Sequence, residues 1–241
     1  MKSINYNVPR IKQGFQDCAQ ASVVQVLNYY GIKKTVADVK KEVPVYVSKK
    51  GLTLGSSIGH IATYLLRLGF KATMHIVDIE IFDRSWANFS KEKLIKSLRQ
   101  RKKFIRHPKY DKDTINVIVE GYIEFLKNGG NIKFPIIDKQ YLLELLEKGP
   151  VIAIVSSNFF YSMPKTRFDK SGKKIIKDSI KGSSATHVVV ISGHKADKFK
   201  IVDPAPKLGG IKWYKTGHLL GSIYLAETDF DSLLISLEKR A

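Results

Sequence analysis

Residues Gln13 to Ser22, Gln-Gly-Phe-Gln-Asp-Cys-Ala-Gln-Ala-Ser, contain the only cysteine of the 241-residue chain. Asp17 is a good N-cap residue, and Gln20 three positions later completes a capping-box pattern. Gly31 is a typical helix stop. Between these signals apolar residues recur with helical spacing, at Ala19, Val23, Val26, Leu27 and Tyr30. The sequence therefore predicts a helix whose first turn contains Cys18.

A cysteine in the first turn of a helix has two interpretations. The unpaired N–H groups and the positive end of the helix dipole favour a reactive thiolate at that position. Free cysteine is also among the most commonly buried residue types, where it behaves as a small hydrophobe. A catalytic role for Cys18 therefore requires a general base elsewhere in the chain.

The candidate base is His187, which begins one β-rich run, and its candidate partner is Asp203, which ends the next. Residues 193–197 between the runs are typical of a hairpin connection. Antiparallel pairing brings the two outer ends side by side, where a carboxylate can fix the tautomer of an imidazole. Taken singly, His187 is explained by core packing and Asp203-Pro204 by a turn. The combination with Cys18 favours a Cys-His-Asp triad.

At these three blocks the sequence resembles a known family. The Cys-Ala-Gln-Ala-Ser helix start, His187-Val-Val-Val and Ile201-Val-Asp-Pro are similar to motifs of the double-glycine leader peptidases, which are papain-like cysteine peptidases. The resemblance covers about 1–79 and 136–206 in the same order.

The resemblance implies a role for each of four residues. Cys18 is the nucleophile, His187 the general base and acid, and Asp203 the residue that orients His187. Gln13 is the oxyanion-hole side chain. It stands five positions before the cysteine, where the family more often has six, so Gln16 stays an alternative. Two further departures are Ala19, where glycine usually follows the cysteine, and the lack of an attached transporter, so a leader-peptide substrate is not implied.

The fold predicted from this order is α+β and papain-like. N-terminal helices, including the nucleophile helix, pack on a C-terminal antiparallel sheet with the site between them. We expect a single domain over 1–241, with a basic helical insertion at about 80–135 and a loop or lid insertion at about 158–184.

The insertion and the end of the chain carry further helix and strand patterns. The insertion predicts helices at Lys91–Phe104, capped by Ser90, and at Asp113–Leu126. Near the end, the patterns predict a strand at Ser222–Glu227 and a last helix at Phe230–Lys239, capped by Thr228-Asp229.

Positive charge is concentrated in two stretches. Residues 91–112 hold ten Lys or Arg against two acidic residues, and residues 165–181 hold seven against two, in a chain of net charge +19. Such charge attracts acidic peptides, anionic membrane surfaces or nucleic acid. Neither stretch carries a nucleic-acid motif, which disfavours nucleic acid, and a solvated lysine-rich face explains the charge equally.

Several classes of function are disfavoured by what the sequence lacks. No apolar run is long enough to span a membrane, and residues 1–10 lack the apolar segment of a signal peptide. With one cysteine, no internal disulfide can form, so we expect a cytoplasmic protein. The spacings of metal sites and of nucleotide-binding loops are absent, so no metal or other cofactor is expected.

The resulting prediction is a thiol hydrolase acting on a peptide or protein substrate through an acyl-enzyme. Two alternatives stay open. The same triad can transfer the acyl group to an amine or thiol in place of water. The chain can also be a catalytically weak binding protein that holds an anionic partner at its basic insertion.

Overall fold

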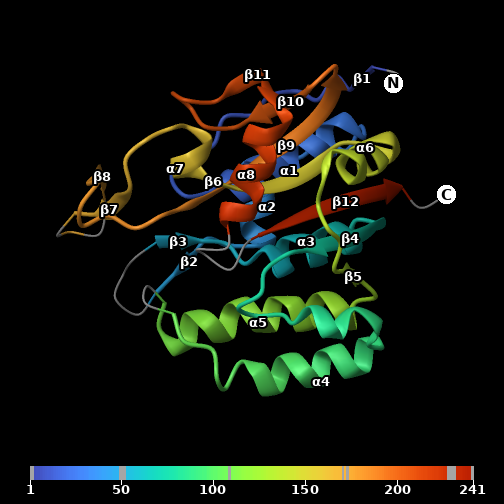
Figure 1. The fold of residues 1–241 in the computed structure, drawn as a ribbon, viewed down its shortest axis with the longest axis vertical. Helices are drawn as coiled ribbons and strands as arrows, with labels where there is room; N and C mark the ends of the chain where they lie inside the picture. Colours follow the sequence, from blue (N-terminus) through green and yellow to red (C-terminus); the bar gives the residue numbers. More distant parts are fainter. Residues whose placement is uncertain are drawn as a thin grey trace.

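The structure is a computed structural model. It describes residues 3–48, 53–107, 110–169, 171, 174–226 and 232–239. Within these residues the main sheet has eight strands, and it is antiparallel except where β4 pairs with β5 (Figure 1). Its order is β11 (Gly210–Lys215), β10 (Lys198–Asp203), β9 (Thr186–Lys195), β6 (Val151–Ser156), β12 (Leu233–Lys239), β4 (Phe70–Ile76) and β5 (Asn131–Lys133), with β1 (Ile4–Asn5) paired to β9.

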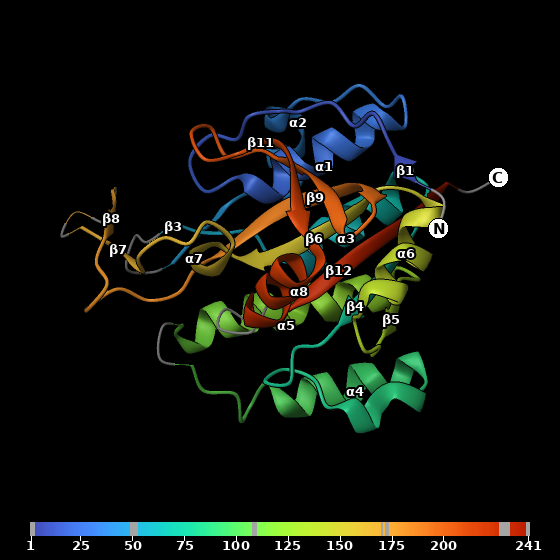
Figure 2. The ribbon, with the colours of Figure 1, turned by 45° about the horizontal axis from the view of Figure 1, so that its top comes forward.

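Helices cover both faces of this sheet (Figure 2). One face packs against α1 (Cys18–Tyr29) and α3 (Ile58–Arg67), which share a hydrophobic core with the side chains of Ile152 and Val190. The other face, which includes Ala153 and Val189, packs against α6 (Lys139–Lys148), α7 (Ser157–Phe160) and α8 (Thr216–Tyr224). The central strands are therefore buried on both sides, and β6 is apolar almost throughout.

The stretch predicted as a basic helical insertion, about 80–135, contains the two predicted helices and, near its end, strand β5 of the main sheet. Helix α4 (Lys91–Arg101) is capped by Ser90, whose hydroxyl accepts a hydrogen bond from the Lys93 N–H, and α5 spans Lys112–Lys127. The short helix η1 (Arg84–Asn88) precedes them. Helix α5 packs on α3, and α4 packs outside α5, so the insertion extends the core on the α1 side of the sheet.

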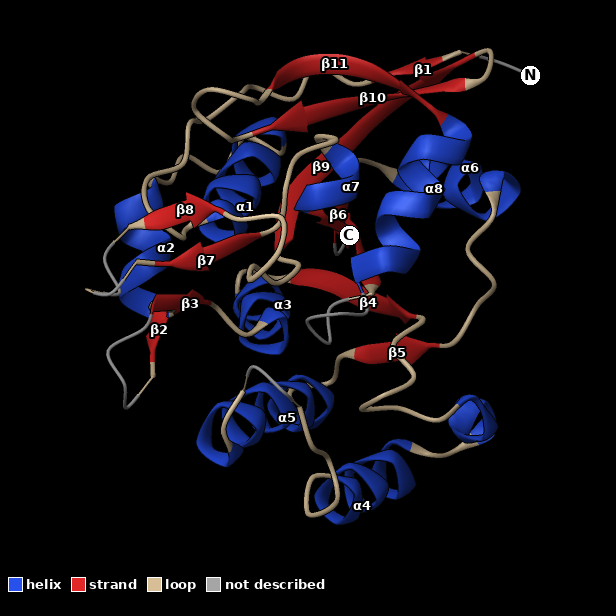
Figure 3. Ribbon diagram, turned by 60° about the vertical axis from the view of Figure 1, so that its left-hand side comes forward, coloured by secondary structure: helices blue, strands red, loops and turns tan. Residues whose placement is uncertain are grey.

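Three small elements complete the described structure. Helix α2 (Val36–Glu42) follows α1 and has a capping box formed by Thr35 and Asp38. Strands β2 (Tyr46–Val47) and β3 (Thr53–Gly55) pair with each other, as do β7 (Thr166–Phe168) and β8 (Ile175–Lys177). The β7–β8 hairpin belongs to the predicted lid insertion and extends away from the main sheet (Figure 3).

Two predictions near the C-terminal end were wrong. The predicted strand at Ser222–Glu227 overlaps the end of α8, and the predicted last helix is largely β12. Strand β12 lies between β4 and β6, where both of its faces are buried. A strand buried on both faces loses the alternation that distinguishes it from a buried helix, and this explains the error. The predicted cap, Thr228-Asp229, lies outside the described residues.

Candidate active site

Cys18 is the first residue of α1, as predicted, and its side chain is half-buried. The helix lies against β9, and Ser22, one turn further along, donates a hydrogen bond from Oγ to the Val188 carbonyl at 3.0 Å. This packing holds the start of the helix against the start of the histidine strand. The thiol is therefore placed beside the free N–H groups of a helix N-terminus.

The predicted capping box at this helix is wrong. Asp17 is the N-cap residue, but its side chain makes no capping hydrogen bond. Its Oδ1 accepts from the Gly14 N–H at 2.6 Å, and its Oδ2 lies 3.2 Å from the Lys40 ammonium. Gln20 donates to the Val43 carbonyl and to Ser56. Both side chains therefore anchor neighbouring loops, and Asp17 fixes the segment that precedes Cys18.

His187 and Asp203 lie on neighbouring strands, and a β-bulge brings them to one face of the sheet. The two-residue turn at Ala196 and Asp197 sets the pairing of Lys195 with Lys198. A regular ladder from that turn would pair Asp203 with Val190 and place its carboxylate on the opposite face from His187. The register instead shifts by one residue at Ser192, so that Val190 pairs with Val202.

The imidazole of His187 bridges the other two predicted triad members. Its Nε2 lies 2.9 Å from Asp203 Oδ1, and it also hydrogen-bonds the Cys18 side chain. Since Nε2 contacts the carboxylate, Nδ1 is the nitrogen available to the thiol. Burial lowers the pKa of His187, but the hydrogen bonds and charges of Asp203 and Cys18 outweigh burial and raise it to about 9. This environment stabilises the imidazolium form.

The Asp203 carboxylate is buried, and both of its oxygens accept hydrogen bonds. Besides His187, Oδ1 accepts from the Ala205 N–H at 2.9 Å, and Oδ2 accepts from the Tyr161 hydroxyl at 2.8 Å. Burial raises the pKa of Asp203, but these hydrogen bonds and the imidazole lower it overall. Arg10 donates to the backbone carbonyls of Asp203 and Ala205 and so fixes the backbone on either side of Pro204.

Tyr161 was not identified as a site residue from the sequence. It follows α7 in an aromatic run that suits a core equally well, and no spacing rule links it to Asp203. Its contact depends on how α7 packs against the sheet, which only the folded structure reveals.

Gln13, the predicted oxyanion residue, lies beside the three predicted triad residues. Its backbone N–H donates to the Pro204 carbonyl at 2.9 Å, directly after Asp203. Its Oε1 is buried and has no hydrogen-bond partner among the described residues, and its Nε2 makes only a long contact of 3.5 Å with the Gly14 carbonyl. The alternative, Gln16, has a positive φ of 57° just before the helix. The backbone of Gln13 is thus fixed at the site, while its side-chain amide makes only one long hydrogen bond to the described residues.

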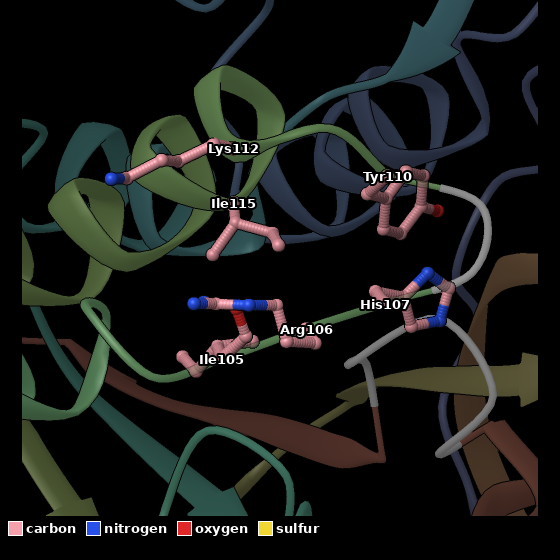
Figure 4. A pocket seen from close by; sticks show the side chains of 6 residues that line it. All are labelled: Ile105, Arg106, His107, Tyr110, Lys112 and Ile115. Atoms are coloured by element: carbon pink, nitrogen blue, oxygen red, sulfur yellow. The ribbon is translucent and has the colours of Figure 1, made fainter.

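A hollow in the basic insertion, lined by none of the residues of this site, is shown in Figure 4. Its volume is about 590 Å³. It combines two cationic side chains and a histidine with apolar and aromatic groups, and the ring of His107 stacks on that of Tyr110 at 4.7 Å. The lining residues are Ile105, Arg106, His107, Tyr110, Lys112 and Ile115.

The described parts of the chain lack both a metal-binding cluster and a membrane-spanning helix. They contain no cluster of His, Cys, Asp and Glu side chains suited to hold a metal ion. They also contain no helix that is both long and apolar enough to cross a bilayer.

Comparison with known proteins gives matches among solved structures alone. No protein-family model matches the chain. No curated protein sequence matches it either. A protein from Bacillus anthracis described as a C39-like peptidase matches with a TM-score of 0.50 and 16% identity over 100% of both chains.

Two other matching structures are peptidase domains of transporters. The peptidase domain of Streptococcus ComA, a bifunctional ABC transporter of a quorum-sensing pathway, has a TM-score of 0.46 and 14% identity, over 97% of this chain and 100% of that one. A double-glycine motif protease from an AMS/PCAT transporter, in complex with the leader peptide, has a TM-score of 0.44 and 16% identity, over 100% and 99%. By its match to the Bacillus anthracis structure, this chain has the α+β, papain-like fold of the C39-like peptidases.

Proposed function

We propose that this protein is a cysteine peptidase or amide hydrolase that works through an acyl-enzyme. The observation that carries the proposal is the imidazole of His187, which contacts Cys18 at a helix start and Asp203 at a strand end. A thiol at a helix N-terminus, a base within reach and a carboxylate behind the base are the groups that nucleophilic catalysis requires. The C39-like fold supports a peptide substrate.

The proposed reaction begins with transfer of the thiol proton to Nδ1 of His187. The Cys18 thiolate attacks the scissile carbonyl, and the resulting oxyanion is met by the Cys18 backbone N–H and the amide of Gln13, with Gln16 as the alternative donor. His187 then donates its proton to the leaving amine as the C–N bond breaks. Water, deprotonated by His187, finally cleaves the thioester and releases the acid.

Turnover of peptide mixtures by matched variants tests this proposal. Cys18→Ala and His187→Ala should each lower turnover by at least about a thousandfold, and the double variant should be little worse, because these residues act as one unit. His60→Ala is the control, since His60 lies outside the site and pairs with Glu124. Mass spectrometry of the cleaved termini is the measurement. Full activity in Cys18→Ala would end the hypothesis.

The alternative of acyl transfer is separated from hydrolysis in the same experiment. Hydrolysis adds the mass of water across the cleaved bond, whereas transfer adds the mass of an amine or thiol supplied in the mixture. Products that carry only the added nucleophile would replace the peptidase by an acyltransferase on the same triad.

We further propose that the basic insertion binds an acidic segment of the substrate or partner. Arg106 and Lys112 line the hollow of Figure 4 together with His107, and this charge is the observation that favours an anionic ligand. Binding of acidic peptides should weaken steeply with salt and with Arg106→Gln. Tight binding of DNA or RNA with a strong salt dependence would favour the nucleic-acid alternative.

A further inference from the structure

Tyr161 completes the set of donors around the Asp203 carboxylate. Its hydroxyl donates to Oδ2 at 2.8 Å, whereas His187 and the Ala205 N–H share Oδ1. Among the described residues, the Tyr161 hydroxyl is the one hydrogen-bond donor to Oδ2. Without this hydroxyl, Oδ2 would accept no hydrogen bond from them. The carboxylate would then be fixed through one oxygen only and could rotate about its Cβ–Cγ bond.

The hydroxyl of Tyr161 is a permanent donor. Burial, reinforced by the negative charge of Asp203 and the hydrogen bond between the two side chains, raises the pKa of Tyr161 far above its ordinary value. The phenol therefore keeps its proton over the whole range in which a thiol and an imidazole titrate. A hydrogen bond from a neutral donor to a buried carboxylate is among the stronger ones in proteins.

The position of Tyr161 is fixed by its surroundings. Tyr161 caps the end of α7, where its backbone N–H donates to the carbonyl of Ser157, the first residue of that helix, and the neighbouring Phe160 is buried in the core. Its ring lies 5.2 Å from that of Phe160 and 5.7 Å from the imidazole of His187. The ring thus lies beside the imidazole that contacts Asp203.

We propose that Tyr161 is a positioning residue that, through Asp203, holds the imidazole of His187 in the orientation required by Cys18. This inference rests on the proposed function and adds one residue to the machinery of Cys18, His187, Asp203 and Gln13. Tyr161 touches neither the scissile bond nor the thiol in this role. It orients the carboxylate, and the carboxylate orients the base.

The test compares Tyr161→Phe with Tyr214→Phe. Both variants keep an aromatic ring and lose one hydroxyl, and both tyrosines lie beside Phe160. Of the two hydroxyls, only that of Tyr161 donates to Asp203. Because Cys18 is the single cysteine of the chain, its alkylation by iodoacetamide can be followed on the whole protein by mass spectrometry, with no peptide substrate.

Tyr161→Phe should slow alkylation at pH 6 and peptide turnover by roughly tenfold, the effect of one hydrogen bond to a charged group. The acid limb of the alkylation profile, in which the alkylation rate falls as the pH is lowered, should also move to higher pH. The reason is that the Tyr161 hydroxyl is one of the groups that lower the pKa of Asp203. Tyr214→Phe should leave the acid limb in place. Circular dichroism checks that both variants are folded.

Two outcomes would overturn the inference. One is a Tyr161→Phe variant that matches the wild type in both rate and acid limb. The other is an equal change in both variants, which would assign the effect to packing of the aromatic cluster. If the wild type cleaves no peptide but its alkylation still depends on His187, the proposed function fails while the alkylation profiles still decide the role of Tyr161.

Discussion

Replacing Asp203 with asparagine should change how the stability of the protein depends on pH. Although burial opposes it, the contacts with Asp203 and Cys18 raise the pKa of His187 from 6.5 to about 9 in the folded state. A base with a raised folded pKa contributes stability that is fully present below pH 6.5 and is lost as the pH rises through 9. That difference corresponds to about 3 kcal/mol of unfolding free energy, at 1.36 kcal/mol per pH unit.

In the Asp203→Asn variant the carboxylate charge is absent while the contact with Cys18 stays, so the pKa of His187 should be lower than in the wild type. The free energy of unfolding of the wild type, measured by urea titration, should therefore fall more than that of the variant between pH 6 and pH 9, by up to about 3 kcal/mol. Asp197→Asn is the control, because Asp197 is exposed in the turn of the same hairpin and pairs with Lys139. Parallel pH profiles for the wild type and Asp203→Asn would refute the reasoning.

Two further predictions concern residues away from the site. Burial, with smaller effects of nearby lysines, lowers the pKa of His75 from 6.5 to about 3, and its ring nitrogens contact Tyr141 and Ser236. The contribution of His75 to stability is therefore present above pH 6.5 and lost in acid. When the pH is lowered from 7 to 5, the free energy of unfolding, measured by urea titration, should fall by about 2 kcal/mol more for the wild type than for His75→Gln. Gly59→Ala should lower the thermal midpoint strongly without altering alkylation of Cys18, because a Cβ there would lie 2.2 Å from the backbone of Gly121; an unchanged midpoint would contradict the close packing of α3 on α5.

The three candidate triad residues could be picked out of the sequence because each lies at a local signal. Cys18 begins a helix with apolar residues at helical spacing, and His187 and Asp203 lie at the outer ends of two β-rich runs joined by a short turn. The bulge at Ser192 could not be predicted, because it depends on the exact length of the turn and on which face each strand buries. The face of the sheet on which Asp203 lies is therefore a property of the fold and not of its motif.

Contacts between distant elements were the main source of error. The side chains of Asp17 and Gln20 match a capping box, yet Lys40, Val43 and Ser56 supply the partners they use. The segment that forms β12 has apolar residues at helical spacing, but the vacant position between β4 and β6 makes it a strand. In each case tertiary contacts outweighed a correct local preference.

The central position of β12 has a consequence for biosynthesis. Leu233–Lys239 is the last strand along the described chain, yet it joins β4 on one side to β6 on the other. While a ribosome is still translating the preceding residues, the two parts of the sheet cannot be joined, and the apolar strands β4 and β6 each keep an unpaired edge. The nascent chain is therefore expected to need protection from aggregation until this strand has left the ribosomal exit tunnel.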